Sequence, residues 1–273
     1  MKCAWVSRIL ILAAAWLSAA CSPTPEKKAP PEAVAELAPI GTLRAAINVG
    51  NAVLAARPAP PHDEPTGISV DLARELARRL GVPVQLIVYD AAGKVVEAGK
   101  AGMWDIAFVA LDPKRAAEIN QSPPYVQIEG AYLVRESSPI RSNDQVDRKG
   151  HRVVVGLNSA YDLHLTRMLR NAEIVRTPTS GAVVETMLKQ NYEVAAGVKQ
   201  QLENDARRLG GVRLLPGRFM VINQAMASRR GREAGARYLR EFVEEMKASG
   251  FVAKAIERHK QPSAIVAPPG DAR

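Results

Sequence analysis

Four consecutive residues, Asp112-Pro113-Lys114-Arg115, have the composition of a helix start that could bind an anion. Asp is a favourable N-cap and Pro suits the first helical position, so the spacing predicts that Arg115 lies in the first helical turn. Unpaired N–H groups there favour an anion, and a guanidinium matches a carboxylate with two parallel hydrogen bonds. Arg115 could instead pair with a nearby acid such as Glu118, or remain solvated. Arg115 and its cap Asp112 are therefore candidate ligand-binding residues.

A second helix start is expected at Ser159-Ala160-Tyr161-Asp162, which has the pattern of a capping box. This pattern places Ser159 and Ala160 beside the unpaired N–H groups of the first turn. The hydroxyl of Ser159 could cap the helix, contact an anion, or do both. Two such helix starts facing one cleft would present positive potential to the same small molecule.

The remaining reactive residue types form no recognisable catalytic or metal-binding motif. The four histidines, which have neither metal-ligand spacing nor neighbouring cysteines, are His62, His151, His164 and His259. The sequence contains no glycine-rich phosphate loop and no G-x-S-x-G motif. We therefore expect no cofactor, no metal and no catalytic residue, although Lys199 or Glu193 could act as an acid or base if the protein were an enzyme.

Strands and helices alternate through the body of the chain, which is typical of α/β proteins with parallel sheets. The hydrophobic pattern predicts strands at 43–49, 84–89, 104–110, 152–156, 173–176, 193–198, 212–215 and 219–228. Besides the two helices that begin near Asp112 and Ser159, helices are expected at 69–80, 91–100, 181–190, 200–209 and 233–249. We expect two lobes, one made of 40–135 with 225–260 and the other of 136–224.

The N-terminus has the layout of a secretory signal. Lys2 and Arg8 give a positive start, and an apolar run then leads to small residues that end at Ala20. The uncharged run from Ile9 to Ala20 is shorter than the roughly 20 residues of a membrane-spanning helix. Residues 1–20 are therefore predicted to be a cleaved signal peptide, and the protein to be periplasmic or otherwise extracytoplasmic.

Cys21 directly follows this segment, in Leu17-Ser18-Ala19-Ala20-Cys21, which is similar to a bacterial lipobox. Cleavage there would leave Cys21 as a lipid-modified N-terminus and as the single cysteine of the mature chain, which excludes an internal disulfide. The proline-rich residues 21–39 would link the lipid anchor to the folded body, and 261–273 are expected to be a disordered tail. A soluble exported form is the alternative.

Composition and charge limit the class of protein and of partner. Of the 273 residues, 47% are hydrophobic and 24% charged, which excludes wholesale disorder, collagen-like repeats and a polytopic membrane protein. A formal net charge of +9 would suit nucleic acid, an acidic membrane or an anionic ligand. Aromatic residues make up only 5%, too few to favour stacking on single-stranded nucleic acid. Because export also argues against nucleic acid, an anionic small molecule is the expected partner.

Several short segments follow the order and spacing of a known family. They are Gly41-Thr42-Leu43-Arg44, 67–73, 80–84, 101–107, Asp112-Pro113-Lys114-Arg115, Ser122-Pro123-Pro124-Tyr125 and 242–251. From 41 to 259 the chain thereby resembles bacterial extracellular solute-binding proteins of family 3, the amino-acid-binding branch of the type II periplasmic proteins of ABC importers. The resemblance implies a two-lobe α/β fold, in which each lobe is a mostly parallel sheet flanked by helices and two hinge strands join the lobes.

The resemblance also implies where a ligand binds. The family has an Arg at the position of Arg115 that holds a ligand carboxylate, and a Thr at the position of Ser159 that contacts it from the second lobe. Tyr125 is expected in the core or the cleft wall. The predicted ligand-binding residues are Arg115, Ser159, Asn51, Lys199, Asp112, Ala160 and Tyr125.

Three departures from the family pattern change the expected ligand. Asn51 replaces an aromatic residue that packs on the ligand, and 108–111 lacks the usual hydroxyl-rich run. Val198 stands where amino-acid binders have an acid for the ligand ammonium, and Lys199 follows it. Because a buried ammonium without a carboxylate partner is poorly compensated, we expect a small carboxylate, or a compound with several acidic groups, rather than a free α-amino acid. Lys199 would either attract a second anion or lie exposed at a helix start.

The function implied by the resemblance is transport. We expect an extracytoplasmic solute-binding protein, held at the membrane by its lipid anchor, that delivers a small anionic solute to the permease of an ABC importer. One alternative is a periplasmic enzyme on the same scaffold, similar to cyclohexadienyl dehydratases. Another is a ligand sensor for a partner receptor.

Overall fold

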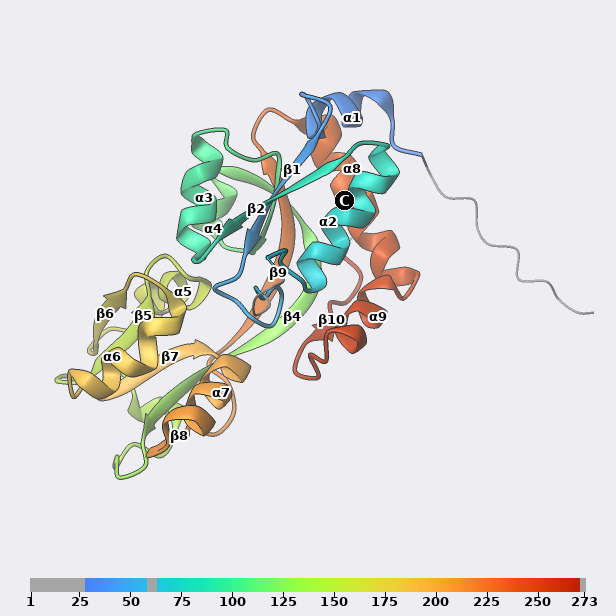
Figure 1. The fold of residues 1–273 in the computed structure, drawn as a ribbon. Helices are drawn as coiled ribbons and strands as arrows, with labels where there is room; N and C mark the ends of the chain where they lie inside the picture. The colour runs from blue at the N-terminus through green and yellow to red at the C-terminus, as the bar shows by residue number, and fades with distance from the viewer. Residues whose placement is uncertain (1–27, 58–62, 271–273) are drawn as a thin grey trace, which may run out of the picture.

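The computed structural model describes residues 28–57 and 63–270. The predicted signal peptide, Cys21 with its lipid anchor, and the first part of the linker lie outside these ranges. The described chain forms two α/β lobes that share strands of one continuous sheet (Figure 1). Within the same ranges, no helix has the length and apolar character needed to cross a membrane.

The first lobe is built on three parallel strands, with β1 (Leu43–Asn48) between β2 (Val84–Tyr89) and β3 (Ile106–Ala110). Every residue of β3 is buried, as expected of an apolar strand covered on both faces. The surrounding helices are α2 (Ile68–Leu80), α3 (Ala92–Lys100), α4 (Pro113–Ala116), α8 (Glu233–Ala248) and α9 (Phe251–Arg258). The apolar stripe predicted for α2 is buried, and Gly81 ends that helix in the left-handed conformation that the absence of a side chain permits.

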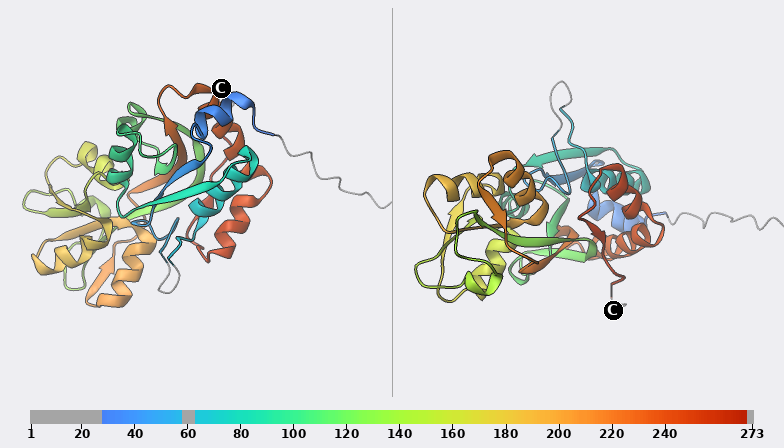
Figure 2. Two further views of the ribbon diagram at one scale, coloured as in Figure 1. Left: turned by 45° about the horizontal axis from the view of Figure 1, so that its top comes forward. Right: turned by 90° about the horizontal axis from the view of Figure 1, so that it is seen from below.

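The second lobe is also built on three parallel strands with helices around them. Here β5 (Arg152–Gly156) pairs in parallel with both β6 (Glu173–Thr177) and β7 (Val194–Val198). The other elements of the lobe are α5 (Ala160–Met168), α6 (Val183–Lys189), α7 (Lys199–Leu209), β8 (Val212–Leu214) and two short 3-10 helices at Asn143–Gln145 and Ser180–Ala182. In Figure 2 the yellow-to-orange middle of the chain forms this lobe, whereas both described ends belong to the first.

Two long antiparallel strands connect the lobes, β4 (Ile119–Arg135) and β9 (Met220–Arg229). The strand order β2-β1-β3-β9-β4-β7-β5-β6 places them in the middle, where β9 pairs with β3 and β4 pairs with β7. The 17 residues of β4 extend over roughly 50 Å, long enough to take part in both lobes. The predicted two-lobe fold with two hinge strands is therefore confirmed.

The strand β4 is a difference from the sequence analysis, which located no strand between residues 110 and 152. Pro123 and Pro124 lie inside the strand, and prolines cannot donate to a strand ladder. The pairing of β4 with β9 changes register on both sides of Pro124, so the irregularity accommodates the prolines without ending the strand.

The predicted extended linker is wrong for its last part, because residues 31–37 form the helix α1 (Pro31–Leu37). Ala33 and Leu37 are buried, and α1 packs against α8. The backbone N–H of Gly235 in α8 donates to Glu36 Oε2 at 2.7 Å. Two apolar residues one helical turn apart thus suffice to hold a proline-rich segment on a complementary surface.

The predicted disordered tail is likewise wrong for most of its length. The strand β10 (Ile265–Val266) pairs antiparallel with β4, and Ala264 and Ala267 are buried. Further along the same segment, the N–H of Gly270 donates to Glu244 Oε1 in α8 at 3.1 Å. Because small apolar residues in a short segment give little periodic pattern, the sequence did not indicate that the tail packs on the body. In the structure it adds a short strand beside β4.

Candidate ligand-binding site

A small hollow lies where the two lobes meet. The first lobe contributes Asn48, Gly50, Asn51, Ala92, Phe108, Val109, Ala110 and Arg115. The second lobe contributes Ser159, Ala160, Tyr161, Ser180 and Val198, and the hinge strand β9 contributes Ile222 and Gln224.

Arg115 is held at this junction by contacts to both lobes. Asp112 caps α4 as predicted, since its Oδ1 accepts the Lys114 N–H at 2.9 Å. The guanidinium of Arg115 is 3% exposed and donates to the carbonyl oxygen of Ala110, at 3.0 Å, in its own lobe. It also donates to the carbonyl oxygen of Asn158 in the second lobe, at 2.9 Å. Because α4 has only four residues, the guanidinium itself, rather than the helix start, supplies the positive charge.

The electrostatics of this position favour an anion. Burial lowers the pKa of Arg115 to about 10, while the neighbouring Asp112 carboxylate acts in the opposite direction. The side chain is therefore charged at neutral pH, although burial destabilises that charge. Over the described chain no ion pair involves Arg115, and the alternative partner Glu118 lies 3.3 Å from Lys100 instead. A buried cation bonded only to neutral carbonyls would gain from an anionic partner.

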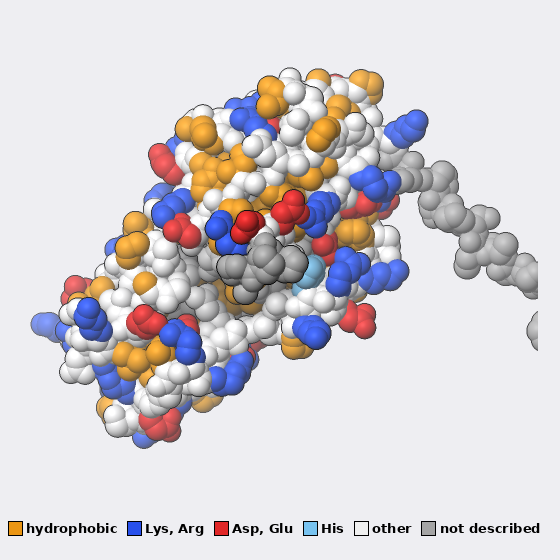
Figure 3. Space-filling view, in the orientation of Figure 1, with side chains coloured by type: hydrophobic (Ala, Val, Ile, Leu, Met, Phe, Trp, Pro, Cys, Tyr) orange, Lys and Arg blue, Asp and Glu red, His pale blue; other side chains and the backbone are white. Residues whose placement is uncertain are grey.

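The charge of the hollow differs from that of the exterior. Figure 3 shows basic and acidic side chains interspersed over the visible face. Of the described lining residues, Arg115 alone is charged, and none is an acid. A small molecule with one negative charge would therefore complement the hollow.

Ser159 and Ala160 lie at the hollow, as the sequence predicted. The first half of the capping box forms, since Ser159 Oγ accepts the N–H of Asp162 at 3.0 Å. The Asp162 carboxylate accepts the N–H of Asn158, at 2.8 Å, instead of that of Ser159. Asn158 has φ +55°, a left-handed conformation that Asn tolerates better than most residues. This turn brings the Asn158 carbonyl to Arg115, so the start of α5 contacts the first lobe directly.

Asn51 also lines the hollow and is 9% exposed. Its backbone carbonyl accepts the N–H groups of Leu54 and Ala55, at 3.0 and 3.1 Å, which fixes the turn after β1. Within the described structure its side-chain Oδ1 is buried and has no hydrogen-bond partner. The hollow therefore contains an acceptor as well as a cation.

Lys199 does not lie where a second anion site was predicted. Its Nζ is 2.9 Å from Glu129 Oε2, and Arg218 approaches the other oxygen of Glu129 at 2.8 Å. These two cations hold the pKa of Glu129 below its usual value. Lys199 is absent from the lining of the hollow, whereas the preceding Val198 is part of it. The Lys199 side chain points toward Glu129 on β4 because the two form an ion pair. The sequence around Lys199 gives no indication of this partner.

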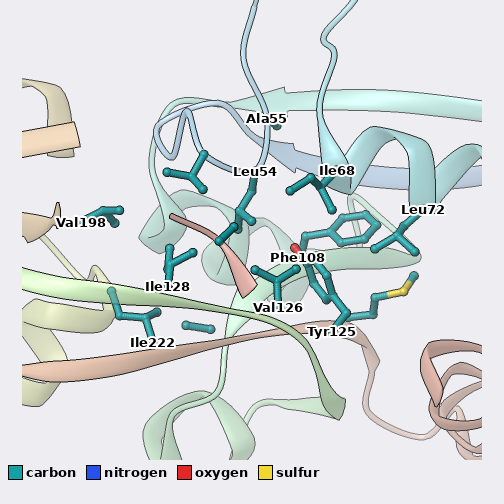
Figure 4. Close-up of a cluster of buried hydrophobic side chains, with 14 of the residues drawn as sticks. Leu54, Ala55, Ile68, Leu72, Phe108, Tyr125, Val126, Ile128, Val198 and Ile222 are labelled. Carbon is teal, nitrogen blue, oxygen red and sulfur yellow. The ribbon is translucent and has the colours of Figure 1, made fainter. Parts of the chain in front are cut away.

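Asp112 and Tyr125 are also outside the hollow. Asp112 Oδ2 lies 2.7 Å from the guanidinium of Arg167 in α5, so this carboxylate joins the lobes instead of facing a ligand. Tyr125 is fully buried, with its hydroxyl 3.1 Å from Ser69 Oγ and its ring edge-to-face with Phe108. Figure 4 shows Tyr125 among apolar side chains of the core. The sequence analysis expected Tyr125 either in the core or in the cleft wall, and it lies in the core.

The sequence analysis missed several lining residues. Asn48 ends β1 and Ser180 follows β6, and polar residues at the carboxyl ends of parallel strands are a usual signal of ligand sites in α/β sheets. Tyr161, whose hydroxyl donates to Ser180 Oγ at 2.6 Å, could have been found one residue beyond Ala160. Gln224 lies inside β9 and carries no local signal.

No group of three or more metal-ligating side chains occurs in the part of the chain that the structure describes. His164 stacks near Phe219, and burial lowers the pKa of its imidazole. Glu193, a possible acid or base, is 2.6 Å from Arg152 and does not line the hollow.

The sequence model of bacterial extracellular solute-binding proteins, family 3, matches residues 56–262. The chain belongs to this family. The match covers the second lobe, both hinge strands and the first lobe except α1, β1 and β10, and it includes Arg115, Ser159 and Ala160 but not Asn51. Among curated protein sequences, none matches the chain.

Solved structures of similar fold agree with this assignment. A solute receptor for L-cysteine from Neisseria gonorrhoeae has 19% identity and a TM-score of 0.73, covering 84% of this chain and 94% of that one. An amino acid ABC transporter substrate-binding protein from Streptococcus pneumoniae, bound to L-arginine, has 18% identity and a TM-score of 0.71, with coverages of 83% and 98%. An ancestral amino acid-binding protein, a precursor of cyclohexadienyl dehydratase, has 20% identity and a TM-score of 0.70, with coverages of 82% and 98%. At these identities the likeness establishes the fold, that of type II periplasmic binding proteins.

Proposed function

We propose that this chain captures a small anionic solute between its lobes outside the cytoplasm and delivers it to the permease of an ABC importer. The observation that carries the proposal is the buried side chain of Arg115, which lines the hollow between the lobes and forms no ion pair with an acid among the described residues. Two of its N–H groups bond to carbonyls, which leaves others for a carboxylate. Family membership supports solute binding, and the S. pneumoniae neighbour supports a link to ABC import.

Closure of the lobes would complete the site. The contact from Arg115 to the Asn158 carbonyl and the ion pair between Asp112 and Arg167 both cross from one lobe to the other. A solute bound first by one lobe would be enclosed when these contacts form, and water would be excluded from its charged group.

A second candidate function is catalysis on the same scaffold, which the dehydratase-precursor neighbour favours. General acid–base catalysis needs a group whose pKa lies near the working pH and that reaches the substrate. The titratable side chains among the described lining residues are Arg115 and Tyr161, and burial raises the pKa of Tyr161 further above neutrality. This set suits binding better than proton transfer. Product formation from prephenate or arogenate would support the enzyme instead.

We also propose that the protein is exported and anchored by lipid at Cys21. The family is one of extracellular solute-binding proteins, and the described body begins a few residues after this cysteine. Incorporation of labelled palmitate into the wild-type chain but not into Cys21→Ser would support the anchor, and equal labelling of both would refute it.

A thermal-shift panel tests the ligand class. Small carboxylates, sulfonates and amino acids are compared with uncharged amides and methyl esters of the same carboxylates. A ligand that binds only the folded protein stabilises it, by roughly 2.7 kcal/mol at a hundred times its Kd. The proposal predicts that at least one carboxylate raises the melting temperature and that its amide and ester do not. Stabilisation by uncharged or cationic compounds, with none by any anion, would overturn it.

A further inference from the structure

We propose that Asn51 makes this protein select a carboxylate that also carries a neutral hydrogen-bond donor, a hydroxyl or an amide N–H, over the same carboxylate with an ammonium group. The proposal rests on the proposed function, in which Arg115 receives the carboxylate. It adds a second point of recognition and names the chemical class of the solute.

The first argument is the unpartnered oxygen. Asn51 is more than nine-tenths buried, lines the hollow, and has a buried Oδ1 that accepts no hydrogen bond from the described chain. Two other polar side chains of the lining have partners within the chain: Asn48 Oδ1 accepts the Gly50 N–H, and Ser180 Oγ accepts the Tyr161 hydroxyl. Buried polar atoms are nearly always paired, so the Asn51 oxygen is an acceptor for which a ligand can supply the donor.

Local structure does not explain this side chain. Asn is common in turns because its oxygen can accept a nearby backbone N–H. In the turn after β1, the backbone carbonyl of Asn51 already accepts from Leu54 and Ala55, and the side-chain oxygen takes no part. The turn therefore does not require a hydrogen-bond acceptor in the side chain of residue 51. This leaves ligand recognition as the role that we propose for the Asn51 oxygen.

The donor should be neutral because of the charges around it. No acid is present among the described residues that line the hollow, and Val198 supplies only an apolar side chain. The nearby carboxylate of Asp112 is already engaged with Arg167 and with the Lys114 N–H. An ammonium enclosed here would lie near the like charge of Arg115 without a counterion. A hydroxyl or amide N–H satisfies the Asn51 oxygen without that cost.

Seven four-carbon acids test the proposal by calorimetric titration: butyrate, its 2-, 3- and 4-hydroxy derivatives, and its 2-, 3- and 4-amino derivatives. Scanning the position makes the test independent of the distance between the two recognition points. At least one hydroxybutyrate should bind about ten-fold more tightly than butyrate, the scale of one buried hydrogen bond, and more tightly than its amino counterpart. Equal binding of butyrate and all hydroxybutyrates, or tighter binding of an aminobutyrate, would overturn the proposal.

Two variants separate recognition from a structural role. Asn51→Leu keeps the approximate size and removes the acceptor, so it should reduce the preferred hydroxybutyrate to the affinity of butyrate and weaken butyrate itself much less. Asn51→Asp adds a negative charge, so it should shift the preference toward the amino counterpart. Thermal melts confirm that both variants are folded. A uniform loss of affinity for all seven acids in Asn51→Leu would assign Asn51 a structural role and refute the inference.

The failure of this inference is distinguishable from the failure of the proposed function. If the wider panel contains no stabilising carboxylate, the proposed function itself fails. If carboxylates without any donor bind and the hydroxybutyrates show no advantage, the anion site at Arg115 stands and only the role of Asn51 is refuted.

Discussion

Two contacts near the hollow join residues of different lobes. Arg115 reaches the carbonyl of Asn158, and the carboxylate that caps its helix reaches Arg167. Neither contact can form when the lobes are apart. Under the proposed function, residues around the hollow have two roles: some face the solute and others stabilise the enclosed state.

The ion pair between Asp112 and Arg167 gives a prediction at this scale. Arg167→Ala should weaken binding of the best carboxylate by up to about five-fold, because Arg167 is half-exposed and such pairs contribute up to about 1 kcal/mol. The loss should shrink in 0.5 M NaCl, where exposed charges are screened. Calorimetry at two salt concentrations measures both effects. Arg170→Ala, at an exposed arginine that follows α5 in the chain, is the control, and an equal loss in both variants would contradict the account.

The candidate site residues that line the hollow are those whose positions follow local rules. Capping patterns placed Ser159, Ala160 and Arg115 at helix starts, and the structure brings all three to the hollow with Asn51. Lys199 does not reach the hollow because its amino group pairs with Glu129, which is 70 residues away along the chain. Pairing across such a separation leaves no trace in a local pattern.

At the scale of elements, the helix α1 attaches the N-terminal segment to the folded body by packing against α8. Leu37 is fully buried, and a Cβ added to Gly235 of α8 would lie 2.8 Å from a methyl carbon of Leu37. The glycine thus permits close approach of the two helices. Residues preceding the first strand therefore contribute to the folded body rather than serving only as a tether.

Replacing Leu37 tests this role of α1. Leu37→Ala should lower the free energy of unfolding by about 2–5 kcal/mol, the usual effect of truncating a buried leucine. Ile40→Ala, at a side chain that is 67% exposed, should change it by no more than about 0.5 kcal/mol. Urea unfolding followed by circular dichroism measures both variants. Similar small effects in the two would show that α1 is not part of the stable core.

The sequence predicted most helices and strands because periodicity and capping are local. It missed α1 and β10, which are too short to show a period, the helix α9, and the first part of β4, which contains Pro123 and Pro124. The elements α1, β10 and β4 depend on partners distant in sequence, and a single sequence contains little information about such partners.

At the scale of the molecule, closure depends on how closely the lobes can approach. Gly93 in α3 faces the loop before α5, and a Cβ there would lie 2.8 Å from Asn158 Cβ and 3.3 Å from the Leu157 carbonyl oxygen. The first distance is shorter than real Cβ contacts, so a side chain at 93 would force the lobes apart. The small residue at this position permits the enclosed arrangement.

Gly93→Ala should therefore weaken solute binding by about five-fold or more, since overpacking costs about 1–3 kcal/mol. Its melting temperature without solute should not fall, because Ala favours a helix more than Gly. X-ray scattering with saturating solute should give a larger radius of gyration than for the wild-type protein. Gly181→Ala, where no atom lies within 4 Å of the added Cβ, is the matched control. Wild-type affinity and radius in Gly93→Ala would contradict this mechanism of closure.

The central claim is that the buried charge of Arg115 holds an anionic solute between the lobes. Calorimetric titration of the best carboxylate into wild-type, Arg115→Ala and Arg218→Ala proteins tests it most directly. Arg218 is an exposed arginine paired with Glu129, so its loss should leave affinity within about two-fold. Arg115→Ala should bind at least about ten-fold more weakly, the effect of losing a charged hydrogen bond. Wild-type affinity in a folded Arg115→Ala protein would contradict the account.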